Sequence, residues 1–72
     1  MNRAEHLKWA KDRAIYELDA GSTTNAFASM ASDLGEHEEL TGHVGIELGM
    51  WQVAHGLMDT SEQCRKWIEG FN

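Results

Sequence analysis

The chain contains 72 residues, with a formal net charge of −6, a single cysteine and no proline. A chain of this length folds as one small domain with a thin core, so we expect a single domain over residues 1–72. The lone cysteine excludes an intrachain disulfide and a zinc site of the CxxC type, and it fits a reducing cytoplasm.

Basic residues are confined to the two ends of the chain, and the middle is acidic. The six cations are Arg3, Lys8, Lys11, Arg13, Arg65 and Lys66. Residues 14–64 contain no lysine or arginine. Direct nucleic-acid binding requires the opposite charge, so we do not expect it. The acidic middle predicts either a surface for a basic partner or one that only keeps the protein in solution.

No segment of the sequence predicts contact with a membrane. Residues 1–14 are charged and lack the apolar centre of a signal peptide. No run of about 18 uncharged apolar residues occurs, which excludes a transmembrane helix. We therefore expect a protein of the cytoplasm.

Helical periodicity predicts two helices in the first half of the chain. The apolar stripe of the first consists of Leu7, Ala10, Ala14 and Leu18. Asn2 caps this helix, which covers residues 3–20, and Gly21 ends it. The second helix covers residues 23–34. The short connection between them makes the pair an antiparallel hairpin.

The second half of the chain predicts two more helices. Residues 43–55 are apolar on two faces, one with Ile46, Met50, Val53 and Leu57 and the other with Val44, Leu48 and Trp51. A helix of this kind is usually buried, so we expect it to be the central helix of the domain. Thr60 caps a fourth helix, which we expect to dock on the third.

These patterns predict an all-α fold, a small four-helix domain made of two antiparallel helical hairpins. A faint repeat has the same spacing, because the residues around Gly21 recur around Gly56, 35 residues later (56 minus 21). A helix–turn–helix unit of about 34 residues is weakly similar to a tetratricopeptide repeat, although the usual proline is missing. Two helical hairpins that end at glycines account for the pattern equally well.

No catalytic motif is present. The sequence lacks GxSxG, P-loop and GxGxxG patterns, and a small helical domain has little room for a ligand pocket of about 300 Å³. Cys64 lies on the apolar stripe of the fourth helix, which favours a structural cysteine over a reactive one. We therefore expect no enzymatic activity, no catalytic residue and no cofactor.

Histidines and acidic residues raise the alternative of a metal site. His43 and Glu47 lie four residues apart on one helix face, and His37 precedes them among acidic residues. Their nitrogen and oxygen atoms suit metal ions, but the spacing matches no zinc motif and HExxH is absent. A hydrogen bond at the surface is the simpler interpretation of the His43 and Glu47 pair.

Three tryptophans in so short a chain exceed the needs of a thin core. They form either one core cluster or part of a protein interface, where tryptophan is enriched. Trp9 is predicted to be the exposed one, because it lies off the apolar stripe of its helix. Trp9, Tyr16, Glu36, Glu38 and Glu39 form the predicted protein-binding set.

Gly45 and Gly49 form a small-xxx-small pair on the third helix. Each glycine costs a soluble helix about 1 kcal/mol relative to alanine, which is tolerated where another helix crosses closely. We expect these glycines and Trp51 to pack against another helix, of the same chain or of a second copy. The alternative is that Gly45 is only a residue of the first turn.

Four segments of the chain together resemble a known family. They are MNRAEHLKWAKDRA at the start, TNAFASMASDL and HVGIELGM in the middle, and WIEGFN at the end. In these segments the chain resembles a family of short proteins encoded by tailed bacteriophages, especially phages of actinobacteria. The resemblance spans nearly the whole chain and implies an accessory role in the cytoplasm of a bacterial host. It implies no particular catalytic or binding residue.

We therefore expect a small, acidic, non-enzymatic phage protein that binds a host protein and modulates host machinery or defence. One alternative is a self-assembling helical protein, a homo-oligomer packed through Gly45 and Gly49. Another is a small metal-binding protein built on His37, His43 and Glu47.

Overall fold

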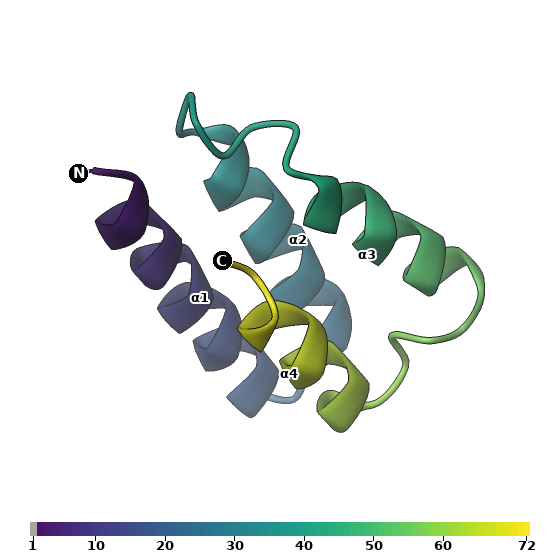
Figure 1. Cartoon of the computed structure of the whole chain (residues 1–72). Coiled ribbons are helices and arrows are strands. Elements are labelled where there is room, and N and C mark those ends of the chain that lie inside the picture. The colour runs from purple at the N-terminus through teal and green to yellow at the C-terminus, as the bar shows by residue number, and fades with distance from the viewer. Residues whose placement is uncertain (1) are drawn as a thin grey trace.

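The structure, a computed structural model, describes residues 2–72, which contain four helices and no strand. The helices are α1 (Arg3–Asp19), α2 (Thr23–Gly35), α3 (Val44–Ala54) and α4 (Ser61–Glu69). The predicted all-α, four-helix fold is confirmed (Figure 1). In the described part of the chain, none of the helices is both long and apolar enough to cross a membrane.

Two of the helices begin with a capping box. The Asn2 side chain accepts a hydrogen bond from the N–H of Glu5 (2.8 Å), and the Glu5 carboxylate accepts one from the N–H of Asn2 (3.2 Å). Thr60 and Gln63 form the same arrangement at the start of α4. Because these bonds satisfy amide groups that the first turn leaves free, they fix where each helix starts.

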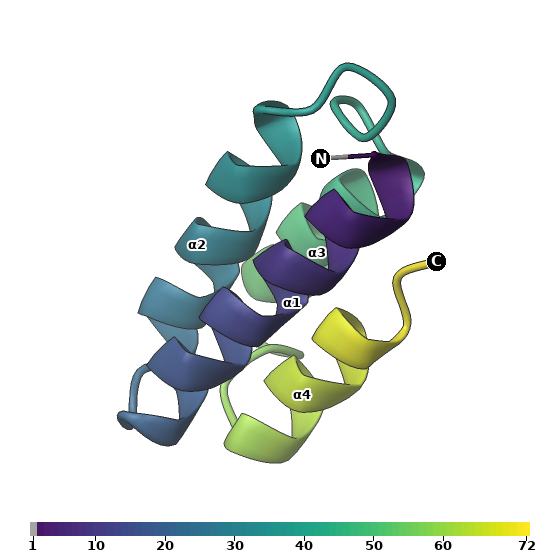
Figure 2. The same ribbon diagram turned by 90° about the vertical axis from the view of Figure 1, so that its left-hand side faces the viewer.

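The first two helices form an antiparallel hairpin and lie side by side in both views (Figures 1 and 2). Gly21 reverses the chain with a φ of +99°, a left-handed conformation that glycine adopts without strain. Ser22 then caps α2 by accepting a hydrogen bond from the N–H of Asn25 (3.0 Å). The hairpin predicted from the short connection is therefore present.

The hydrophobic core lies between α1, α2 and α4. The backbone of α4 approaches both helices of the hairpin, and side chains of all three helices meet in one cluster. The largest fully buried side chains are Met30, Leu34, Leu40, Ile68 and Cys64. Burying a side chain of this size contributes about 1.5–3 kcal/mol, so this cluster is the main source of stability.

The prediction that the third helix is central was wrong. In Figure 1, α3 lies at the edge of the molecule, on the side away from α1. Its backbone approaches no other helix as closely as α1, α2 and α4 approach one another, and Gly49 is its one buried residue. The other three helices already enclose the core, so most of both predicted apolar faces of α3 stays at the surface, and the side that bears Gly45 and Gly49 is the covered one.

The segment between α2 and α3, residues 36–42, is anchored more firmly than its polar sequence predicted. Leu40 is fully buried and belongs to the core cluster. The ring of His37 lies beside the ring of His6 of α1, with 5.0 Å between their centroids. The exposed residues of the segment include Glu36, Glu38 and Glu39. The acidic side chains thus stand on a loop whose backbone is held in place.

Candidate protein-interaction site

Helix α3 turns an apolar surface to solvent. Five exposed apolar side chains belong to the helix, and a sixth, Leu57, lies in the turn that follows. The six are Val44, Leu48, Met50, Trp51, Val53 and Leu57. We call these six side chains the α3 face. Val44 is 71% exposed and Trp51 is 54% exposed, whereas no side chain of the core exceeds 8%. The one charged residue of α3 is Glu47.

The size of the α3 face distinguishes it from scattered surface residues. Single exposed apolar side chains are normal on a folded protein and carry no information. Six large ones on a single helix and its exit turn present an area on the order of 500 Å², which is the range of the largest apolar patch on a typical monomer. Patches of this size are often sites of interaction with another molecule.

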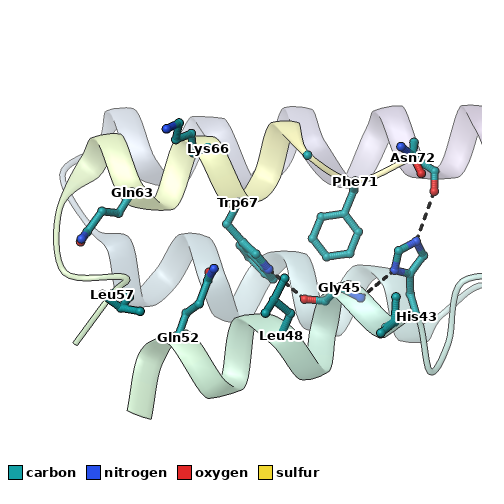
Figure 3. Close-up of a pocket in the computed structure, with 12 residues that line it drawn as sticks. His43, Gly45, Leu48, Gln52, Leu57, Gln63, Lys66, Trp67, Phe71 and Asn72 are labelled. Atoms are coloured by element: carbon teal, nitrogen blue, oxygen red, sulfur yellow. Dashed lines mark hydrogen bonds between the residues drawn. The ribbon is translucent and has the colours of Figure 1, made fainter. Parts of the chain in front are cut away.

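The opposite side of α3 is fixed to α4 by two aromatic rings. A Cβ atom on Gly49 would lie 2.6 Å from Cε2 of Trp67, and one on Gly45 would lie 2.7 Å from Cε2 of Phe71. The indole N–H of Trp67 donates a hydrogen bond to the carbonyl of Gly45 (2.9 Å). Figure 3 shows both rings reaching from α4 and its exit toward α3. The two glycines therefore face α4 and the residues that follow it in the same chain, and Trp51 lies on the outward side instead.

A groove of about 560 Å³ runs between α3 and α4 (Figure 3). Its lining includes Leu48, Gln52 and Leu57 from the α3 side and Gln63, Lys66, Trp67 and Phe71 from the α4 side. Since Leu48 and Leu57 line the groove and also belong to the α3 face, the two surfaces are continuous. The expectation that the domain has little room for a pocket of about 300 Å³ was wrong.

His43 is engaged at both of its ring nitrogens. Its Nδ1 accepts a hydrogen bond from the N–H of Gly45 (2.9 Å), and its Nε2 donates to the carbonyl of Asn72 (3.2 Å). Within residues 2–72, no three histidine, cysteine or acidic side chains gather closely enough to hold a metal ion. The structure does not bring His37, His43 and Glu47 together into such a group.

The predicted protein-binding set is not gathered on one surface. Trp9 packs at the edge of the core, where its ring lies 5.1 Å from that of His6 and 4.7 Å from the guanidinium carbon of Arg13. Trp51 is more exposed, so the choice of Trp9 as the exposed tryptophan was wrong. Tyr16 is 73% exposed. It lies toward the far end of α1 from the acidic loop, which sits beside the start of that helix.

Most of the cations are used within the chain. Three ion pairs join Lys8 to Asp12, Arg13 to Asp33 and Arg65 to Asp19, with N···O distances of 2.7, 2.9 and 2.9 Å. Arg3 and Lys11 donate hydrogen bonds to the carbonyls of Asn72 and Phe71. Lys66 is the cation for which residues 2–72 show no such contact, and it lines the groove. Little positive charge is thus available on the α3 side of the molecule.

A buried polar cluster at the contact of α1 and α2 was missed in the sequence. Asp33 is 4% exposed and pairs with Arg13, and its backbone carbonyl lies 2.6 Å from Nε2 of the buried His6. The available signal was an acidic residue beside Met30 and Leu34 on the apolar stripe of α2. Because each buried side-chain nitrogen or oxygen atom in residues 2–72 has a hydrogen-bond partner, the cluster helps to fix the hairpin.

Cys64 lies in the core, as its position on the apolar stripe predicted. It is fully buried, and its Sγ is 3.9 Å from the carbonyl of Thr23. Burial raises the pKa of the Cys64 thiol above its ordinary value, because the thiolate would lose its solvation. A thiol that stays protonated is a poor nucleophile, so Cys64 has no reactive role in this environment.

The chain was compared with protein-family models, curated proteins and solved structures. No protein-family model, no curated protein and no solved structure matches the chain.

Proposed function

We propose that the chain is a non-enzymatic binding module that holds another protein on the α3 face. The observation that carries this proposal is the exposure of six large apolar side chains on one helix and its exit turn. A helix as rich in apolar residues as α3 is normally covered on its apolar sides. Its own chain covers the side that bears Gly45 and Gly49, together with Ile46, which packs against the core. A partner protein would cover the rest.

The partner that we propose is a protein of a bacterial host. The chain would then be a small, acidic phage accessory protein that acts in the host cytoplasm and modulates host machinery or defence. The resemblance of its ends, MNRAEHL and WIEGFN, to short phage proteins supports this origin. The buried free cysteine fits a reducing compartment.

The lining of the groove favours binding over catalysis. Its surface is mainly apolar, although the lining also includes the polar side chains of His43, Gln52, Gln63, Lys66 and Asn72. His43, which also lines it, uses both ring nitrogens in hydrogen bonds to the backbone. A nucleophile with an adjacent base is the usual sign of covalent catalysis, and the side chains that meet here do not supply that pair.

A second candidate function is self-assembly through the same surface. It is favoured by the exposed apolar side chains of the α3 face, which in a second copy would meet the same side chains. A standard interface buries about 800 Å² on each partner, so the α3 face, on the order of 500 Å², would supply a large part of one. A strict monomer at high concentration in static light scattering would remove this candidate.

Affinity capture from the lysate of an actinobacterial host tests the proposed function. The wild-type chain, Trp51→Asp and Tyr16→Asp serve as baits, because both substitutions place a charge at an exposed aromatic position. We expect the wild type and Tyr16→Asp to retain the same host protein and Trp51→Asp to lose it. Circular dichroism checks that each bait is folded. Equal retention by all three baits, or by none, would contradict the proposal.

A further inference from the structure

Charge around the α3 face is almost entirely of one sign. Glu47 lies one turn before Met50 and Trp51, so it stands within the exposed arc of the helix. Asp59 and Glu62 follow the exit of α3 and are exposed. The chain has no lysine or arginine between residues 14 and 64. An occupant of the face therefore meets apolar side chains flanked by carboxylates.

A second copy of the chain does not complement this surface. Packing two α3 faces together would take Glu47 of each copy out of water, and α3 has no basic side chain to pair with it. Within residues 2–72 the one cation without an ion pair or hydrogen bond is Lys66, which lies in the groove on α4 and not on α3. Desolvating a carboxylate without a partner is strongly unfavourable. The net charge of −6 on each copy adds repulsion.

An anionic membrane surface is excluded by the same charges. Helices that lie in a membrane interface carry lysine and arginine beside their apolar side, and these are attracted to acidic lipids. The charged residue beside the apolar side chains of α3 is instead an acid, Glu47. The acidic flank of the α3 face is thus unsuited to lipid and suited to a protein surface with basic groups.

The shape of the site fits a helix. α3 has 11 residues, which corresponds to about 16 Å, or three turns of a partner helix lying along it. A helix laid in a groove is anchored by apolar side chains that recur every three or four residues. The groove of about 560 Å³ between Leu48, Leu57 and Trp67 admits one such side chain beside the face.

We infer that the occupant of the α3 face is an amphipathic helix of another protein, whose apolar stripe is flanked by lysine or arginine. This inference rests on the proposed function and names the class of partner. One cation of the partner pairs with Glu47, and others lie near Asp59 and Glu62. Such charge complementarity sets the choice of partner and the rate of association, while the apolar stripe supplies most of the buried area.

Two synthetic helical peptides with the same leucine stripe test the inference, one with lysines and the other with glutamates beside the stripe. Calorimetric titration of the wild-type chain should show about tenfold tighter binding of the lysine peptide. That preference should weaken as salt is raised, because salt screens the charges. Equal affinity for the two peptides, or no binding of the lysine peptide, would overturn the inference.

Two variants with the same change in charge make the test specific. Glu47→Gln should weaken binding of the lysine peptide by about tenfold, since a partly desolvated ion pair is lost. Glu17→Gln on α1 removes the same charge away from the α3 face and should leave the affinity unchanged. An equal loss in both variants would mean non-specific attraction and would overturn the inference.

Leu48→Asp separates failure of the inference from failure of the proposed function. We expect it to abolish binding of the lysine peptide, because it places a charge where the α3 face meets the groove. If both peptides bind equally and Leu48→Asp abolishes both, the basic class of partner is rejected and a binding role for the face survives. If Leu48→Asp changes no binding, the face is not the binding surface and both proposals fail.

Discussion

Trp67 is held so firmly that the residue facing it has no room for a side chain. The indole is 7% exposed, its ring lies 5.0 Å from that of Phe27, and it donates a hydrogen bond to the carbonyl of Gly45. Gly49 lies directly against this ring. Although glycine weakens a helix by about 1 kcal/mol relative to alanine, packing requires it at this position.

The substitution Gly49→Ala is expected to lower the free energy of unfolding by about 1 kcal/mol. Overpacking costs about 1–3 kcal/mol, which exceeds the gain of about 1 kcal/mol in helix propensity. Gly35→Ala is the matched control, because a Cβ atom there meets nothing within 4 Å. Urea denaturation of both variants measures the effect. A more stable Gly49→Ala protein would contradict the prediction, because it would show that the Trp67 ring can move to make room for the added Cβ atom.

Cys64 should make stability fall in alkaline solution. Because burial raises the pKa of its thiol, the unfolded chain releases the thiol proton at a lower pH than the folded one. The contribution is fully present below the ordinary thiol pKa, about 8.5, and is lost as pH rises through the higher folded pKa. Denaturation curves at several pH values measure it against Cys64→Ala, which should show a shallower alkaline decline. Identical slopes would contradict the argument.

At the scale of the elements, helix ends were predictable and the place of α3 was not. The Asn2 and Thr60 caps depend on residues only three positions away, so the sequence contains all the information needed. The position of α3 depends on where the rings of Trp67 and Phe71 come to rest, which is decided by the packing of α4 on the hairpin. A helix with two apolar sides does not itself indicate which side is covered.

The weak attachment of α3 predicts its dynamics. Its contacts with α4 are chiefly the two rings against Gly45 and Gly49, whereas α1 and α2 pack along their length. We therefore expect the amides of α3 to exchange with solvent at a lower opening free energy than those of α1 and α2. Native-state hydrogen exchange measures this residue by residue. Protection of α3 equal to that of the hairpin would contradict it.

At the scale of the molecule, charge and apolar surface are divided between two sides. Five of the six basic residues, all but Lys66, contact acids or carbonyls of their own chain, while α3 carries an exposed apolar face with Glu47 within it. The sequence located the acidic middle but placed the contact residues at Trp9 and Tyr16, because residues off a stripe seemed free. The candidate site arises instead because α1, α2 and α4 enclose the core without α3. That outcome depends on how the whole chain packs.

Photo-crosslinking in a bacterial host tests most directly whether another protein covers the α3 face. A photoreactive amino acid replaces Trp51 in one variant and Tyr16 in a control, since both positions are exposed. We predict a covalent adduct from position 51 that joins the 8.1-kDa chain to a host protein, and none from position 16. An adduct only from position 16, a product of two copies of the chain, or no adduct from position 51 would contradict the account.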